Sequence, residues 1–483
     1  MSYPLPEAPR PVEAPVAAGT RVVLDARARF LDRDFVLGGS PRRLLRLPGG
    51  SAAVARRWRD GDKVRHGEER FARTLIQQGL LVTSGSEPID PHDIDVIIPV
   101  CDDPRSLRAL LEGLGGFEVT VVDDASNDPQ IVRDCAQEFG ARLVRLEVNS
   151  GPGAARNAGA RSTARPFLWF LDVDVSLEDA ADVARRLSAH LRDPLVSAAA
   201  PRIRGAAGSS ARERFERRFS PLDMGQHSAL VVPGGAVPYV PSACLFVRRD
   251  AFGEGFDEGL RTGEDVDLVW RLHDRGWLVR YDARILVSHR ARDSWRRWWS
   301  QRVGYGASSG DLARRHGVRL APVRVDTWTL IAVLSVICGR PLLAGRIVRA
   351  ARDQMIQRVS SISDQPRDVA NAVVVRGMSQ AALPLVRSTV RTFGVVILVA
   401  ALHPRLRWRA LLVFLLGTIA RGRSVRMRPR EIPLAVADDL AYSMGVVKGA
   451  WRNRSMTSLR PSITRSTLRV ADVLGLARRP FAP

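Results

Sequence analysis

The sequence contains little cysteine and almost no lysine, and both shortages limit what the protein can be. None of its cysteines forms a C-x-x-C pair or has a nearby histidine at the spacing of a zinc site. They are Cys101, Cys135, Cys244 and Cys338. A disulfide framework is therefore not expected, and a reducing compartment fits. Lysine occurs only as Lys63 and Lys448, so arginine carries the positive charge.

After about Asp326 the chain has apolar stretches, but none of them is long enough to cross a membrane unaided. Three uncharged stretches in this region hold 13, 12 and 11 residues, and they are Thr327–Gly339, Thr392–His403 and Ala410–Ala420. A helix of the longest stretch would measure about 20 Å, whereas the hydrocarbon core is about 30 Å thick. Arginines flank these stretches, which leaves two interpretations open: an ordinary helical bundle, or helices that lie on an anionic membrane surface.

Positive charge is in large excess, because Lys and Arg number 73 and Asp and Glu number 51, a net charge of +22. Such a surplus attracts polyanions, including nucleic acid, anionic lipid and nucleotide diphosphates. No nucleic-acid-binding signature accompanies it, so nucleic acid is not expected as a partner. The N-terminus has no signal-peptide pattern. We expect a cytoplasmic protein, with peripheral attachment to the inner face of the cell membrane as an open alternative.

Composition and periodicity divide the chain into four parts. Residues 1–19 are rich in Pro and Ala and are predicted to be a disordered tail. Residues 20–86 combine short strands with two helices and predict a small winged-helix-like α+β module. Residues 92–325 alternate strands and helices, which predicts an α/β domain whose parallel sheet has helices on both faces. Residues 326–483 predict a mostly helical C-terminal region.

The stretch Phe167–Val175 runs from large apolar residues into two carboxylates, Asp172 and Asp174. The apolar part is typical of a strand buried on both faces, and ligands bind at the carboxyl ends of such strands. Mg²⁺ and Mn²⁺ are held by carboxylates together with substrate phosphates. The pair therefore predicts a metal-diphosphate site, with Asp174 as metal ligand and Asp172 facing the sugar or ribose. The alternative is an acidic turn.

Three further polar segments fit a nucleotide-sugar site. Asp123 and Asp124 end a predicted strand, where a carboxylate can bind a nucleoside or cap a turn. Arg156 begins a helix after the glycine-rich stretch 149–153, which can approach phosphate. Glu264 and Asp265 precede another helix, and Asp265 can act as the general base for an acceptor hydroxyl. The alternative for Asp265 is a helix cap.

His289 follows the last predicted strand of this domain. An imidazole there can serve as a further ligand of the metal or diphosphate, or it can be structural. Trp295, Trp298 and Trp299 follow it, and their rings suit either a sugar or a packing edge.

Taken together, these motifs resemble glycosyltransferase family 2. The segments Ile94–Val100, Val121–Ser126, Gly153–Asn157, Leu171–Asp174 and Gly263–Asp265 recur in that order in this family. The resemblance covers about residues 92–310 and implies a GT-A fold and an inverting transfer. It also implies a nucleoside contact at Asp124 with Asp123, a metal on Asp174, and Asp265 as base. We further expect Arg156, Asp172 and Glu264 to contact the donor. The family often has glycine where this sequence has Ala125.

The whole layout further resembles the glycosyltransferases of the mycofactocin peptide-cofactor system. Residues 20–84 are similar to small modules that bind precursor peptides, on the segments Leu44–Gly50 and Leu75–Leu81. This resemblance implies UDP-glucose as donor, a ribosomal-peptide-derived redox cofactor as acceptor, Mg²⁺ or Mn²⁺ as cofactor, and a β-linked oligosaccharide as product. Two alternatives stay open: a transferase for polyprenyl phosphate or cell-envelope glycan, and a peptide-binding scaffold with an inactive transferase domain.

Overall fold

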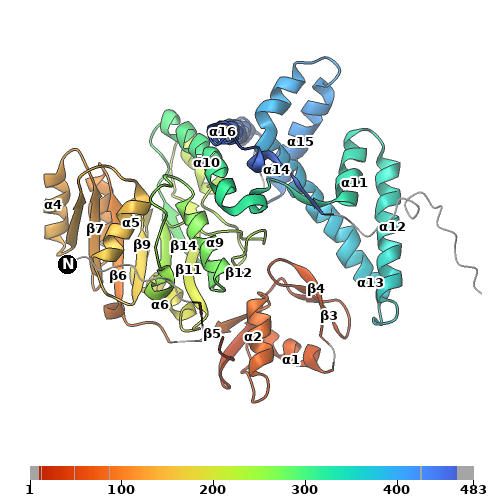
Figure 1. Cartoon of the computed structure of the whole chain (residues 1–483), viewed down its shortest axis with the longest axis horizontal. Helices are drawn as coiled ribbons and strands as arrows, with labels where there is room; N and C mark the ends of the chain where they lie inside the picture. Colours follow the sequence, from red (N-terminus) through yellow and green to blue (C-terminus); the bar gives the residue numbers. More distant parts are fainter. Residues whose placement is uncertain (1–9, 12, 48, 86, 425–426, 465–483) are drawn as a thin grey trace, which may run out of the picture. The chain divides into compact units, whose positions relative to one another are not determined.

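The computed structural model of the chain describes residues 10–11, 13–47, 49–85, 87–424 and 427–464 (Figure 1). These residues fall into two compact units. The described residues within 1–28, 38–43 and 53–292 form the first unit, and those within 29–37, 44–52 and 293–483 form the second. The predicted module 20–86 therefore contributes residues to both units. The helix that follows Asp293 belongs to the second unit, although the sequence placed it in the α/β domain.

A mixed sheet forms the core of the first unit, in the strand order β8-β7-β6-β9-β13-β11-β14-β10, with β12 paired to β14. Its strands are β6 (Ile94–Val100), β7 (Glu118–Asp124), β8 (Arg142–Leu146), β9 (Phe167–Leu171), β10 (Val175–Ser176), β11 (Val196–Gly205), β12 (Ala229–Leu230), β13 (Cys244–Arg248) and β14 (Leu278–His289). Strands β6 to β9 are parallel, as predicted.

Strand β13 is antiparallel to β9 and β11, so the prediction of a parallel sheet was wrong for this part. Helix α7 (Ala211–Phe219), strand β12 and an irregular segment connect β11 to β13, and β13 then runs in the opposite direction to β11.

Helices of the first unit surround this sheet (Figure 1). They are α3 (Pro104–Leu111), α4 (Pro129–Glu138), α5 (Pro152–Arg161), α6 (Ala180–His190), α7 (Ala211–Phe219), α8 (Arg249–Phe252) and α9 (Glu264–Asp274). Aspartates cap α3, α4 and α6, because Asp103, Asp128 and Asp179 accept from backbone N–H groups of the first turn. Helix α5 lies so close to the sheet that a Cβ on Gly159 would meet Ile97 Cγ2 at 2.5 Å.

The N-terminal segment combines short strands with two α-helices, as the sequence predicted, and adds elements that it did not predict, β2, η1 and η2. Its elements are β1 (Arg21–Leu24), β2 (Arg29–Phe30), β3 (Phe35–Gly38), β4 (Arg43–Arg46), α1 (Ser51–Arg57), η1 (Trp58–Asp60), α2 (Glu69–Gln77), β5 (Leu81–Ser84) and η2 (Pro91–Asp93). Strand β1 pairs with β5, whereas β2, β3 and β4 form a separate sheet. Of the predicted disordered tail, residues 1–9 and 12 lie outside the described residues. Residues 13–19 contact α2, where the Val16 N–H donates to Glu69 O at 3.3 Å.

The second unit is mostly helical after Asp293, as predicted. Its elements are α10 (Trp295–His316), η3 (Gly317–Leu320), β15 (Arg324–Asp326), α11 (Thr327–Ile337), α12 (Pro341–Val359), α13 (Pro366–Ala370), η4 (Asn371–Val375), α14 (Arg376–Ala401), α15 (Arg407–Ser424), η5 (Pro429–Glu431), α16 (Ile432–Arg452), η6 (Thr457–Leu459) and β16 (Ser462–Thr464). Helices α10 and α16 approach backbone to backbone: a Cβ on Gly306 would lie 2.1 Å from Tyr442 O. Only glycine permits this approach at that position.

Candidate functional site

The two aspartates after β9 are held beside the end of β14. The Asp172 N–H donates to Ala243 O at 2.9 Å, and the Val175 N–H donates to Asp172 O at 3.0 Å, which turns the chain. Strand β10 then pairs antiparallel with β14 and sets Val175 opposite His289. Asp174 Oδ1 consequently lies 3.0 Å from His289 Nε2. The structure thus brings together two residues that are far apart in the sequence, as the metal-site prediction requires.

Asp172, Asp174 and His289 each offer one ligand atom, and these atoms lie within 4.8 Å of one another. Burial raises the pKa of Asp174, but the neighbouring His289 and Arg292 outweigh it, so the pKa is below its ordinary value. Burial lowers the pKa of His289, but Asp174 and then Asp172 outweigh it, so that pKa is raised. Two carboxylates and an imidazole form a donor set that suits Mn²⁺ or Mg²⁺.

Arg156 joins this cluster to the acidic pair of α9. Its Nη2 donates to Asp172 Oδ1, and its Nη1 donates to Glu264 Oε1 at 3.0 Å. The guanidinium is buried, and its carbon lies 5.3 Å from the centre of the Phe256 ring. Burial opposes its charged form, but Asp172 and Glu264 outweigh this effect and raise the pKa of Arg156. A buried arginine between two carboxylates fixes the separation of the segments that carry them.

Asp265 lies in the first turn of α9, beside Glu264. Its Oδ1 accepts from the Val266 N–H at 2.7 Å. Burial and then the charge of Glu264 raise the pKa of Asp265 to about 7. A carboxylate whose pKa lies near neutral pH can take up a proton during a reaction, and such shifts are typical of functional sites. The predicted helix-cap role falls instead to Gly263, at a φ of 87°.

Asp123 and Asp124 are buried at the end of β7, and both bind groups of this chain. Asp123 Oδ1 accepts from the Ser126 N–H at 2.9 Å, and its other oxygen accepts from Arg145 Nη1. Asp124 accepts from the N–H groups of Ser150 and Gly151 at 2.7 and 2.8 Å. Asp124 therefore holds the glycine-rich loop that leads into α5. Contact of either carboxylate with a nucleoside stays a prediction.

Comparison with known proteins places this arrangement in a family. The sequence model described as Glycosyl transferase family 2 matches residues 95–256. Along 475 residues the chain is 34% identical to the pre-mycofactocin glycosyltransferase of Mycobacterium tuberculosis, which covers 92% of this chain and 98% of that protein. The chain is a family 2 glycosyltransferase of the mycofactocin type. Its central sheet is that of a GT-A-like fold, as the motifs predicted.

This family 2 glycosyltransferase is also similar to proteins that share a smaller part of its length. An uncharacterised glycosyltransferase of Escherichia coli is 26% identical over 227 residues, which cover 44% of this chain and 56% of that protein. Among solved structures, a mannosyltransferase of Pyrobaculum calidifontis, in complex with GDP-mannose and Mn²⁺, is 15% identical. The alignment covers 76% of this chain and 90% of that one, with a TM-score of 0.42.

Several residues around the candidate site were missed by sequence reasoning. Arg145 stands opposite Asp123 in the register of β7 and β8, so the parallel pairing of these strands could have found it. Arg292 Nη1 lies 3.7 Å from Asp174 Oδ2, three positions after His289. Arg261 donates to the side chain and backbone oxygens of Asn149 at 2.8 Å, so the loop before α9 holds the loop before α5. No local motif marks this long-range contact.

Proposed function

We propose that this family 2 glycosyltransferase is a metal-dependent, inverting hexosyltransferase that moves glucose from UDP-glucose to a mycofactocin-type acceptor. The acceptor is the peptide-derived redox cofactor, and repeated transfer builds a β-linked oligosaccharide. One observation carries the proposal: Arg156 bridges Asp172 of the three-residue cluster and Glu264 of the α9 pair. This bridge places the candidate metal ligands and the candidate base on one framework.

Asp174 and His289, with Asp172, are the residues that would hold Mn²⁺ or Mg²⁺. The carboxylate oxygens are the donors that these ions prefer, and the imidazole nitrogen offers a third ligand atom, all within 4.8 Å of one another. Such an ion, when bound, neutralises the diphosphate of the donor and stabilises the charge on the departing UDP. Arg292 adds a positive charge next to Asp174, with 3.7 Å between its Nη1 and Asp174 Oδ2.

The loop before α5 is proposed to receive the nucleotide end of the donor. Asp124 fixes the backbone of Ser150 and Gly151, and Arg261 fixes Asn149, so the loop is held from both sides. Asp123, the residue before Asp124, forms an ion pair with Arg145. A loop fixed before the donor binds needs little ordering on binding.

Asp265 is proposed to act as the general base. With its pKa near 7, the carboxylate removes the proton from the acceptor hydroxyl as that oxygen attacks the anomeric carbon. The bond from that carbon to the diphosphate oxygen breaks, and UDP leaves with the electron pair. A single displacement inverts the configuration, so an α-linked donor gives a β-linked product, as in inverting glycoside chemistry.

Acceptor choice is assigned to the N-terminal segment 20–86, which resembles peptide-binding modules. The identity to the pre-mycofactocin glycosyltransferase extends over 92% of the chain and so takes in most of this segment. Addition of the peptide as a strand along an exposed sheet edge is one way in which a small sheet binds an extended peptide.

The test is to incubate the purified protein with Mn²⁺, pre-mycofactocin and either UDP-glucose or GDP-mannose, and to analyse the products by mass spectrometry. The proposal predicts mass increments of one or more hexoses with UDP-glucose. Hexose addition from GDP-mannose alone would overturn the donor assignment. Transfer to a polyprenyl phosphate in place of the peptide-derived acceptor would overturn the acceptor assignment.

A further inference from the structure

The hairpin of α14 and α15 ends in a tip that is apolar, basic and exposed. Among the described residues of this hairpin, large apolar side chains are exposed at Val396, Leu398, Val399, Leu402, Leu406, Trp408, Leu411, Leu415 and Ile419. Leu402 is 81% exposed and Trp408 is 70% exposed. Isolated exposed apolar residues are common, but a contiguous group of this size marks an interaction surface.

The charge of the hairpin has a single sign. From position 376 to position 424 the sequence holds eight arginines and no lysine, aspartate or glutamate. Three of these arginines are exposed near Leu402 and Trp408: Arg405 lies between the helices, and Arg407 and Arg409 lie in the first turn of α15. A partner for this surface must therefore be both apolar and anionic.

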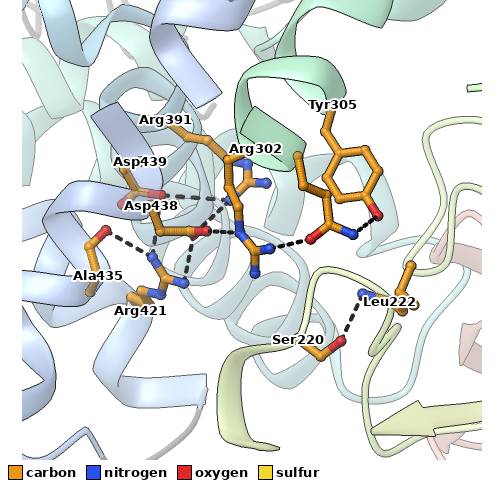
Figure 2. Close-up of polar contacts among 10 residues, drawn as sticks. Ser220, Leu222, Arg302, Tyr305, Arg391, Arg421, Ala435, Asp438 and Asp439 are labelled. Atoms are coloured by element: carbon orange, nitrogen blue, oxygen red, sulfur yellow. Dashed lines mark hydrogen bonds and ion pairs between the residues drawn. The ribbon is translucent and has the colours of Figure 1, made fainter. Parts of the chain in front are cut away.

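The inner part of α14 is bound inside the helical unit by a buried charge network (Figure 2). Arg391 Nη1 lies 3.4 Å from Asp438 Oδ2, and Arg387 Nη1 lies 3.8 Å from Asp439 Oδ2, both on α16. By length and composition, the helical stretch Pro366–Ala401 is the described one that could cross a membrane. Because Arg387 and Arg391 pair with α16, a lipid-spanning position would either separate these pairs or carry their charges into hydrocarbon.

The outer part of the hairpin is too short to span a bilayer. Uncharged residues run from 392 to 404 in one arm and from 410 to 420 in the other, 13 and 11 residues. At 1.5 Å per residue these arms measure about 20 and 16 Å, against a hydrocarbon core of about 30 Å. Loop-first insertion would also carry three arginines into hydrocarbon.

We propose that the tip of the α14–α15 hairpin docks on the surface of an anionic lipid bilayer without crossing it. Leu402, Trp408 and their apolar neighbours enter the boundary between head groups and acyl chains. Arg405, Arg407 and Arg409 bind lipid phosphates. Tryptophan and arginine at this level match the side chains that proteins place at membrane interfaces.

Charge favours this occupant over a second copy of the chain. In a dimer formed through two such tips, the arginines of one copy would lie close to those of the other, and their repulsion would oppose contact between the apolar side chains. An anionic bilayer supplies both an apolar interior and negative head groups, and the energies of the two contributions add.

The experiment is flotation of the full-length protein with vesicles of phosphatidylcholine, with and without one-third phosphatidylglycerol. Three proteins are compared with the wild type. The first is R405Q/R407Q/R409Q, the second is L402S/W408S, and the third is R133Q/R185Q/R346Q, a control that removes three exposed arginines elsewhere. All changed side chains are exposed, so thermal unfolding should be unaffected and serves as the folding check.

The proposal predicts binding to phosphatidylglycerol vesicles that falls on the order of 100-fold in R405Q/R407Q/R409Q. Binding should fall at least about tenfold in L402S/W408S and stay unchanged in the control.

Equal loss of binding in the control would mean that positive charge anywhere on the surface attracts the vesicles, and it would overturn the assignment to this tip. A wild-type dimer in sedimentation analysis that L402S/W408S converts to a monomer, without vesicle binding, would assign the surface to self-association. The assay needs no donor or acceptor, so its outcome is independent of the proposed enzymatic function.

Discussion

His289 Nε2 lies 3.0 Å from Asp174 Oδ1, and this pair joins the end of the longest strand of the sheet to the turn after β9. The antiparallel pairing of β10 with β14 creates the contact. Because Asp172 and Asp174 belong to one segment and His289 to another, the three ligand atoms converge only when the sheet is complete. Binding of a divalent ion should therefore report on the folded site.

Asp174→Asn is expected to weaken Mn²⁺-dependent UDP binding by about 100-fold or more, because it removes a charged ligand atom from the cluster. Isothermal titration calorimetry with Mn²⁺ and UDP measures this. Asp179→Asn is the matched control, since it removes the same charge five positions away and keeps a side chain that can cap α6. Equal Mn²⁺-dependent affinity in the two variants would contradict the metal assignment.

Asp265→Asn is expected to leave UDP binding within about threefold of wild type and to reduce kcat by about 10²–10⁴-fold, because only proton removal is lost. In the wild type, kcat/KM should rise with pH through about 7, since the base acts when deprotonated. In Asp265→Asn, kcat/KM should not show this rise near pH 7. Transfer assays from pH 5.5 to 8.5 would measure it, and a wild-type profile that is flat across neutrality would count against Asp265.

The raised pKa of Asp265 also predicts that the stability of the fold decreases as pH rises, whereas the activity increases. A carboxyl group whose folded-state pKa is raised above its unfolded value stabilises the fold below the unfolded pKa, and this stabilisation is lost as pH rises through about 7. Asp265→Asn should therefore be more stable than wild type at pH 8, by on the order of 1–3 kcal/mol. Chemical denaturation at pH 6 and pH 8 tests this, and a smaller gain at the higher pH would be inconsistent with a raised pKa.

Arg156→Lys should lower kcat/KM by on the order of 10²-fold, because an ammonium cannot bridge Asp172 and Glu264 in the planar geometry of a guanidinium. Arg161→Lys is the control on the same helix, where Arg161 Nη1 pairs with Glu258 at 3.1 Å. If steady-state kinetics showed the same loss in both variants, the bridge would have no special role.

The buried network of the helical unit predicts a large stability effect. Asp438 accepts from Arg302 Nε at 3.0 Å and from Arg421 Nη2 at 2.9 Å (Figure 2). Asp438→Asn should destabilise the protein by about 3–5 kcal/mol, since it leaves buried guanidinium groups without a counter-charge. Asp353→Asn, on the exposed face of α12, is the control and should change stability by less than about 0.5 kcal/mol.

The pH dependence of this network has a defined sign. Burial raises the pKa of Asp438, but Arg421, Arg391 and Arg302 outweigh it and lower the pKa to about 2. The stabilisation is complete above the unfolded value, near 4, and disappears as pH falls toward 2. Acid unfolding of the wild type should therefore be steeper than that of Asp438→Asn, and parallel curves would refute the assignment.

Local pattern predicted much of this fold and of the candidate site. Apolar runs before Asp172 and Asp123 indicated buried strands whose ends face one edge, and the strand–helix alternation indicated parallel pairing of β6 to β9. The antiparallel β13 was not predictable, because periodicity marks a strand and not its direction. The partners of the site aspartates, such as Arg145 and Arg292, depend on strand register, which no single motif encodes.

The role of each site residue depends on neighbours that a local motif does not show. The carboxylate of Asp124 accepts from the backbone of Ser150 and Gly151, and its predicted contact with the nucleoside stays a prediction. Asp172 was expected to face the sugar, and it lies in the metal-ligand cluster while it also pairs with Arg156. A short acidic motif shows that carboxylates are needed at a strand end, but the neighbours that fold against it determine what each one binds.

The anomeric configuration of the first sugar added is the most direct test of the central claim, that Asp265 and the Asp172, Asp174 and His289 cluster carry out one inverting displacement. The measurement is proton NMR of the product formed from α-linked UDP-glucose and pre-mycofactocin in the presence of Mn²⁺. The account predicts a β-linked glucosyl product that is absent when Asp265→Asn is used. An α-linked product, or a β-linked product formed equally well by Asp265→Asn, would contradict it.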